Sequence, residues 1–441
     1  MLAFLIFLLT LFGILARPFG FGVWVYSSLG ALFTLCFNLI NFNDLGFIFS
    51  LIWDSSLTLI ALIIISFCLQ AFGFFERLIF LVLKFCVKSK NPLENFSQNQ
   101  LSINAKSLFI RLLLLCALCS SVLANDGAIL IFTPLVLGLF LRAKKADFRL
   151  IIVFLFASGF VCDISSNALI ISNLTNIISA NYHKIGFYDF AFTMLLPNLL
   201  GFLAMLFLFL LVFNDLLKQD LIFSHISAPK LSNRLFAFYL MLLFAFVLSF
   251  FISQKFGVPL CVNSIIFAFI LLFILWHKSH KKALNAIKAT PFSIIVFVFG
   301  LFIVVFALSK IEILQNNEAF FNFILENKFL AIFSSGTISA LGASVFNNLP
   351  MVLFANLSIN DFLLNAELSL ENAREMLAYA SLLGANIGSK LTPIGSLCTL
   401  LWLGLLAKKR IKISFIKYFS YSLIFTLPTL FCALFGLYIV F

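Results

Sequence analysis

Apolar segments long enough to cross a lipid bilayer follow one another along almost the whole of this 441-residue chain. A transmembrane α-helix needs about 20 mostly apolar residues, which these segments supply repeatedly. Only 10% of the residues are charged and 63% are hydrophobic, whereas about 25% of the residues of a soluble domain are charged. These features exclude a soluble globular, disordered or disulfide-rich protein. They predict an all-α polytopic membrane protein.

The basic residues are concentrated in six of the polar segments that separate the apolar runs. Most acidic residues outside the apolar runs fall in the segments that alternate with these. Because cytoplasmic loops carry an excess of Lys and Arg, we expect the basic segments in the cytoplasm and the acidic ones outside. The formal charge of +12 therefore indicates membrane topology and not a nucleic-acid partner. The basic segments are Arg17, 84–106, 142–149, 218–234, 278–288 and 408–417.

Two segments do not fit the simple alternation of sides. Residues 107–141 have basic residues at both ends, and Ala124-Asn125-Asp126-Gly127 in their middle is too polar for lipid. Residues 329–360 lie between acidic stretches and contain Asn347-Asn348-Leu349-Pro350. We predict two re-entrant hairpins that enter the membrane from opposite sides. The alternative is two membrane-crossing helices joined by a polar turn, which would place basic loops outside.

The polar interruptions recur in two halves of the chain. Asn125 and Asn347 are 222 residues apart, and each hairpin is followed by an interrupted helix, at about 148–180 and about 372–407. Because the halves enter from opposite sides, we predict an inverted-repeat transporter, in which paired broken helices mark the binding site. The predicted units are N-terminal transmembrane helices (1–46), a first repeat (47–213), a cytoplasmic linker (214–234) and a second repeat (235–441).

The interruptions supply neutral polar groups at membrane depth. Broken helices leave backbone groups unpaired, and Asn, Ser and Thr beside them form a cavity suited to a small hydroxylated solute. The alternative is that these residues only pack helices together. The candidate solute-binding residues are Asn125, Asn173, Thr175, Asn347, Asn348, Thr392 and Ser396. The residues expected to turn the backbone are Gly127, Pro350, Gly388, Pro393 and Gly395.

Three ionisable residues fall in apolar surroundings beside these interruptions. A charge at the bilayer centre costs at least about 2.5–3.5 kcal/mol, so such residues are functional candidates. We predict that Asp126 and Asp163 carry a coupling proton and that Lys390 neutralises one of them. An ammonium group gains nothing from an uncharged solute, so a role for Lys390 as a solute ligand is not expected.

No metal or cofactor site is expected. The nine cysteines lack metal-ligand spacing, and Cys116 and Cys119, one helical turn apart, are interpreted as small buried hydrophobic residues. The four histidines are interpreted as solvated loop residues; they are His183, His225, His277 and His280.

The motifs at these positions resemble those of the bacterial arsenite efflux permeases, within a larger superfamily of inverted-repeat ion transporters. The Asn-Asp-Gly-Ala…Thr-Pro motif of that family matches residues 125–128 and 133–134, and its Ser-Asn-Leu stretch matches residues 172–174. Its Asn-Asn-Met-Pro motif is close to residues 347–350, and residues 392–402 also fit. The similarity covers nearly the whole chain.

The resemblance implies a carrier of the bacterial inner membrane and not an enzyme. It implies export of trivalent arsenite or antimonite as uncharged hydroxides, in exchange for protons, which would confer arsenic resistance. Some relatives dock on a cytoplasmic ATPase. The chain departs from the family at Asn386, where the family usually has Asp, and at Cys162 and Cys398, where it commonly has Ala. The missing carboxylate leaves the number of coupled protons open.

Other functions are compatible with parts of the same pattern. A related carrier for silicate or another small anion, or a sodium/proton antiporter, would share the same architecture. An intramembrane enzyme would need a nucleophile–base pair or a metal cluster within the membrane, and the apolar segments contain no His/Glu pair that could supply one.

Overall fold

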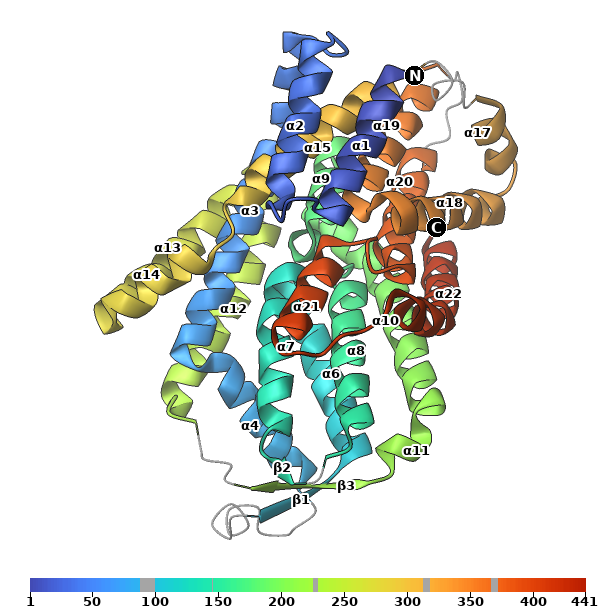
Figure 1. Ribbon diagram of the computed structural model, residues 1–441. Coiled ribbons are helices and arrows are strands. Elements are labelled where there is room, and N and C mark those ends of the chain that lie inside the picture. The colour runs from blue at the N-terminus through green and yellow to red at the C-terminus, as the bar shows by residue number, and fades with distance from the viewer. Residues whose placement is uncertain (88–99, 145, 225–228, 312–317, 366–371) are drawn as a thin grey trace.

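The computed structural model describes residues 1–87, 100–144, 146–224, 229–311, 318–365 and 372–441 (Figure 1). Within these residues, nine helices are long and apolar enough to cross a membrane. This confirms the prediction of an all-α polytopic membrane protein. Parts of the predicted basic segments, among them Lys88, Lys90 and Lys145, and residues 225–228 of the linker with His225, lie outside the described residues.

The first half of the chain contains α1 (Leu2–Ala16), α2 (Val23–Cys36), α3 (Phe42–Phe72), α4 (Phe74–Cys86), β1 (Gln100–Asn104), α6 (Ala105–Val122), α7 (Asn125–Phe140), β2 (Ala143–Lys144), α8 (Phe148–Ser165), η1 (Ile170–Ser172), α9 (Leu174–His183) and α10 (Phe187–Val212). The rest contains α11 (Asn214–Leu217), β3 (Asp220–Ser224), α12 (Asn233–Ser253), η2 (Gln254–Phe256), α13 (Leu260–Lys278), α14 (His280–Ala289), α15 (Ser293–Ser309), α17 (Glu318–Leu325), α18 (Lys328–Phe346), α19 (Asn348–Asn365), α20 (Ala373–Gly388), η3 (Ser389–Leu391), α21 (Leu397–Lys408) and α22 (Phe415–Val440).

Helices α6 and α7 form a hairpin whose two outer ends return to the same place. Strand β1 leads into α6 and β2 follows α7, and both pair antiparallel with β3 in a sheet of order β1-β3-β2. Figure 1 shows this sheet at one end of α6, α7 and α8. Three of the predicted cytoplasmic segments therefore meet on one side of the molecule. Re-entry of this hairpin into a membrane stays a prediction.

The small sheet was not predicted from the sequence. Its strands have only five, two and five residues, so they show no alternation of apolar and polar side chains long enough to recognise. They form because backbone N–H and C=O groups in the connections need hydrogen-bond partners, and three connections lie together.

Helices α18 and α19 form the second hairpin. The break between them is the single residue Asn347, whose φ of 80° and ψ of 150° form a conformation that residues other than Gly rarely adopt. The contacts of the surrounding residues hold the backbone in this conformation. The Asn347 side chain accepts a hydrogen bond from the backbone N–H of Leu349, 3.3 Å away, at the start of α19. Helix α18 packs closely along α20.

Each hairpin is followed by a helix that breaks and restarts. Helix α8 ends at Ser165 and α9 begins after Asn173, while α20 ends at Gly388 and α21 begins after Ser396. Asn and Ser are favoured helix N-caps because their side-chain oxygens accept from exposed backbone N–H groups. Asn173 accepts from the Thr175 N–H, and Ser396 accepts from the Thr399 N–H.

Gly388 allows the second broken helix to touch the second hairpin. A Cβ atom there would lie 2.2 Å from Ala340 Cβ on α18, a distance that real contacts do not allow. The absence of a side chain at this position therefore brings the two backbones together. Gly395 allows a close approach within the break itself, since a Cβ there would lie 2.1 Å from the carbonyl oxygen of Ser389 in η3.

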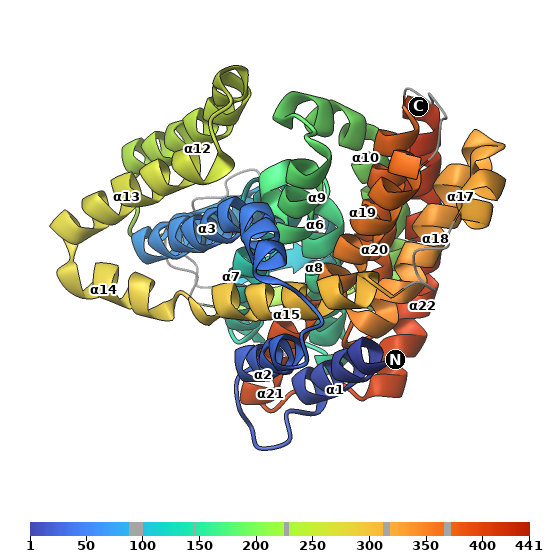
Figure 2. The ribbon, with the colours of Figure 1, turned by 90° about the horizontal axis from the view of Figure 1, so that it is seen from above.

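Helices α8, α9 and α20 of the two broken segments occupy the middle of the molecule, whereas α21 lies toward its edge (Figure 2). Helices α12, α13 and α14 lie on one side, and α10, α18 and α22 lie on another. Helix α12 buries only Tyr239, Phe246 and Phe250 along its 21 residues. Its remaining apolar side chains are the surface that a bilayer would cover.

Candidate functional site

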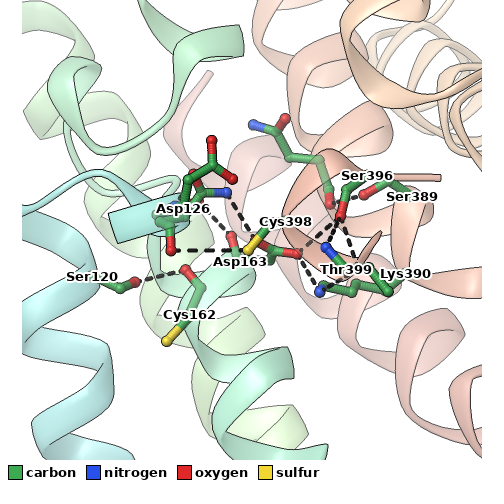
Figure 3. A network of polar contacts seen from close by, with 12 residues as sticks. Ser120, Asp126, Cys162, Asp163, Ser389, Lys390, Ser396, Cys398 and Thr399 are labelled. Carbon is green, nitrogen blue, oxygen red and sulfur yellow. Dashed lines mark hydrogen bonds and ion pairs between the residues drawn. The ribbon is translucent and has the colours of Figure 1, made fainter. Parts of the chain in front are cut away.

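An ion pair joins the two broken helices. Asp163, near the end of α8, pairs through Oδ2 with the ammonium of Lys390 in η3. The side chains are only 3% and 2% exposed, respectively. Because isolated charges are costly in an apolar environment, this pairing makes both charges tolerable. The two predicted ionisable residues from different halves are thus brought into contact (Figure 3).

Hydroxyl groups at the start of α21 complete the surroundings of Lys390. Its ammonium donates to Thr399 Oγ1, 2.8 Å away, and lies 5.6 Å from the centre of the Phe160 ring. Thr399 Oγ1 and Ser396 Oγ are 2.8 Å apart, and Ser396 Oγ donates to Asp163 Oδ2 at 3.4 Å. The same residue that caps α21 therefore also contacts the charged pair.

The tip of the first hairpin contacts the other carboxylate oxygen. Asn125 Nδ2 donates to Asp163 Oδ1 at 2.8 Å, and the Asn125 carbonyl accepts from the Cys398 thiol at 3.8 Å. The Asn125 side chain also accepts from the backbone N–H of Asp126 at 2.8 Å. The Asp126 carboxylate is buried and forms no ion pair with a cation of the described residues. Figure 3 shows it pointing away from the Asp163–Lys390 pair.

The tip of the second hairpin contacts the same break from another direction. Asn347 Nδ2 donates to the Ile394 carbonyl at 3.0 Å, and the Asn348 N–H donates to the Gly395 carbonyl at 2.8 Å. The Thr392 hydroxyl donates to the carbonyl of Ser344, one turn before the tip. Both hairpin tips therefore meet the segment from Thr392 to Thr399, although each contacts different residues of it.

A second group of polar contacts crosses between the halves. Asn386, near the end of α20, donates through Nδ2 to Asn167 Oδ1 at 2.7 Å and to Asn176 Oδ1 at 2.9 Å. The Thr175 hydroxyl donates to Asn386 Oδ1 at 2.7 Å. All four residues are buried. Asn173 Nδ2 lies next to this group and donates to Ser166 Oγ at 3.3 Å.

Two groups of contacts thus cross between the halves: the first crossing contains Asp163 and Lys390, and the second contains Asn386 and Asn167. Sequence reasoning missed several residues of these two crossings. Thr399, Asn167 and Asn176 were not singled out, and Asn386 was noted only as a departure from the resembling family. A signal was present in the sequence. Two five-residue segments at equivalent places in the halves share Ile at the second position and Ser at the fourth. They are Asp163-Ile164-Ser165-Ser166-Asn167 and Asn386-Ile387-Gly388-Ser389-Lys390.

The expectation that His183 is a solvated loop residue is wrong. His183 is the last residue of α9 and is buried, and its Nε2 lies 3.1 Å from Asn356 Oδ1 on α19. Packing of α9 against α19 covers it. His277 and His280 are exposed, as expected, but they lie in the last turn of α13 and the first turn of α14 and not in loops. Among the described residues, no group of three or more His, Cys, Asp or Glu side chains could hold a metal ion.

The polar crossings are closed to solvent, and a cavity lies on the side of the sheet. It has a volume of about 800 Å³ and lies between the end of α3, α4 and the outer half of α7. Polar and charged side chains in its wall include Gln70, Glu76, Lys230 and Lys282. Gln70 lies one turn along α3 from Ser66, and a Cβ at Gly127 would lie 3.0 Å from Ser66 Oγ. One residue of the cavity wall is thus a helical turn away from the residue that packs against the tip of the first hairpin.

Comparison with known proteins identifies the family. The family model described as "Arsenical pump membrane protein" matches residues 2–441. The chain belongs to this family. The arsenical pump membrane protein of Escherichia coli (strain K12) is 30% identical, with 98% of this chain and 97% of that protein covered.

Other relatives agree. The arsenical pump membrane protein of Yersinia enterocolitica is 31% identical over the same shares of both chains. A putative arsenical pump membrane protein of Bacillus subtilis (strain 168) is 26% identical, with 95% of each chain covered. These relatives are named as membrane pumps and not as enzymes. Together with the nine candidate spans, they establish a multi-pass protein of the bacterial inner membrane.

Proposed function

We propose that this protein exports arsenite or antimonite from the cytoplasm in exchange for protons and so confers arsenic resistance. The observation that carries the proposal is the buried Asp163 carboxylate, which accepts from an amide of the first half and a hydroxyl of the second, with a second buried carboxylate, Asp126, next to that amide in the chain. Membership of the arsenical pump family supports the choice of solute.

The chemistry of the solute explains the exchange. A trivalent metalloid hydroxide is uncharged at neutral pH and offers hydroxyl groups that donate hydrogen bonds. An ionised carboxylate accepts such bonds strongly, whereas a protonated one has lost part of its accepting capacity. A proton and the solute therefore compete for Asp126. Exclusive binding of one or the other is what an antiporter requires.

Asp163 and Lys390 have a different part in the proposal. Because their charges neutralise each other, the site keeps a carboxylate that accepts from Ser396 and Asn125 without carrying a net charge within the membrane. Protonation of Asp163 would remove the negative charge next to Lys390 and weaken the contact between the halves. The pair would thus couple proton binding to the relative position of the two broken helices.

The proposal predicts that the cavity beside α7 is the cytoplasmic entrance. Gly138 lines it, and a Cβ there would meet no atom within 4 Å. Gly138→Trp should therefore fold normally, fill part of the cavity and lower export at least tenfold. Gly404→Trp is the matched control, because Gly404 is exposed and also has open space around it. Equal export by both variants would exclude this entrance.

The function itself is tested in reconstituted vesicles with an imposed pH gradient. Arsenite and antimonite uptake should follow the proton gradient, without sodium and without an ATPase. Silicate is tested as the competing substrate, and a sodium gradient is tested as the competing driving force. Transport of silicate alone, or driven by sodium alone, would replace the proposal by a related carrier. Uptake that requires an added cytoplasmic ATPase would remove proton exchange from it.

A further inference from the structure

The two polar crossings occupy equivalent places in the two halves. Asp163 is two residues before the end of α8, and Asn386 is two residues before the end of α20. Ser166 Oγ donates to the Asp163 carbonyl at 2.6 Å, and Ser389 Oγ donates to the Asn386 carbonyl at 2.8 Å. Each of these helices thus ends with the same local turn.

The cross-contacts follow the same rule. Asp163 contacts Lys390, which stands four positions after Asn386. Asn386 contacts Asn167, which stands four positions after Asp163. In each contact, a residue near the end of one broken helix meets the residue four positions beyond the equivalent point in the other half. The two contacts are therefore related by the internal repeat. One contact is an ion pair and the other is a pair of amides.

We propose that Asn386 and Asn167 form the uncharged counterpart of the Asp163–Lys390 pair, and that they position the broken helices without titrating. Only one of the two crossings then changes charge during transport. This second statement rests on the proposed function, whereas the positioning of the helices does not.

The hydrogen bonds around Asn386 require an amide at this position. Asn167 Nδ2 donates to the Ile164 carbonyl at 2.9 Å, and Asn176 Nδ2 donates to the carbonyls of Ser166 and Leu169 at 2.8 and 3.0 Å. Because a carbonyl oxygen only accepts, both NH₂ groups are committed to the backbone. The Oδ1 atoms of Asn167 and Asn176 must therefore face Asn386, which has to offer a donor.

A carboxylate at position 386 would face these two acceptors without a proton to give them. Asn386→Asp should therefore lower the melting temperature of the purified protein by several degrees at pH 8. At pH 5 the loss should shrink, since a protonated carboxyl group can donate one hydrogen bond. Asp126, Asp163 and Lys390 of the neighbouring crossing are present in every sample, so each variant is compared with the parent at the same pH.

Asn356→Asp is the matched control. Asn356 is equally buried, but its Oδ1 accepts from Ser179 Oγ at 3.2 Å and lies 3.1 Å from His183 Nε2, while its Nδ2 has no partner among the described residues. A carboxylate keeps both contacts there. Asn356→Asp also buries a charge, but its oxygens face donors, so it should lose clearly less melting temperature at pH 8 than Asn386→Asp. The proposal fails if Asn386→Asp melts like the parent or if the control loses as much.

A double-mutant cycle tests the equivalence with the ion pair. Asn167→Lys with Asn386→Asp creates in the second crossing the charges of the first. The double variant should melt higher than the sum of the two single effects predicts, whatever the lysine costs in packing. A coupling of zero, or one that makes the double variant worse, would overturn the equivalence. Parent vesicles should move at most two protons per arsenite, one each for Asp126 and Asp163, and a higher ratio would refute only the statement on transport.

Discussion

Replacing Lys390 by Met should sharply lower the amount of folded protein. Met has a similar length but no charge, so the Asp163 carboxylate would remain buried without its counter-ion. Breaking a buried pair by removing one partner costs about 3–5 kcal/mol in soluble proteins. We expect little monodisperse protein after detergent extraction and size-exclusion chromatography, and a much lower melting temperature for what remains.

Asp163→Asn should rescue Lys390→Met, because both charges are then absent. An Asn at position 163 still offers an oxygen to Asn125 Nδ2, which now donates to Asp163 Oδ1. Asp126→Asn is the matched control and should give no rescue, since Asp126 forms no ion pair with Lys390. Rescue by the control, or by neither variant, would show that another group balances Lys390. The rescued double variant is expected to be stable but uncoupled from protons.

Asp126→Asn should abolish transport driven by a pH gradient while leaving the fold intact. The substitution removes the titrating group but no ion pair, and the backbone N–H of Asp126 keeps its bond to the Asn125 side chain. Arsenite exchange without a gradient should persist, because an amide oxygen still accepts a hydrogen bond. The measurement compares arsenite uptake into vesicles with and without an imposed pH difference.

Asp189→Asn provides the comparison for this prediction. Asp189 is exposed in the first turn of α10, so its loss should change neither folding nor coupling. If Asp126→Asn retains full proton-driven uptake, the coupling proton is not carried by Asp126. If it loses folded protein as well, Asp126 has a structural contact that the proposal omits.

Much of the architecture follows from local properties of the sequence. Hydropathy alone indicates a membrane protein, because each apolar run carries its own signal. The helix breaks near residues 166–173 and 389–396 were also predicted, since Asn, Ser, Gly and Pro interrupt helices wherever they cluster. The composition near the breaks likewise singled out Asp163, Lys390 and Ser396, which the structure brings together.

The pairing of distant residues could not be predicted from the sequence. Either Asp126 or Asp163 could have faced Lys390, because both are lone carboxylates in polar breaks of the same half. The tertiary structure decides in favour of Asp163, by placing the end of α8 against η3. The burial of His183 was missed for the same reason, since Asn356 belongs to a hairpin far along the chain.

The sequence by itself therefore determined the membrane class of the protein, the positions of its helix breaks and its family. Only the tertiary structure decided which polar groups meet, that the second crossing is made of amides, and that three short connections form a sheet. The physical reason is the range of the interactions. Hydropathy and helix breaking depend on neighbours in sequence, whereas an ion pair or a buried amide contact depends on the packing of helices hundreds of residues apart.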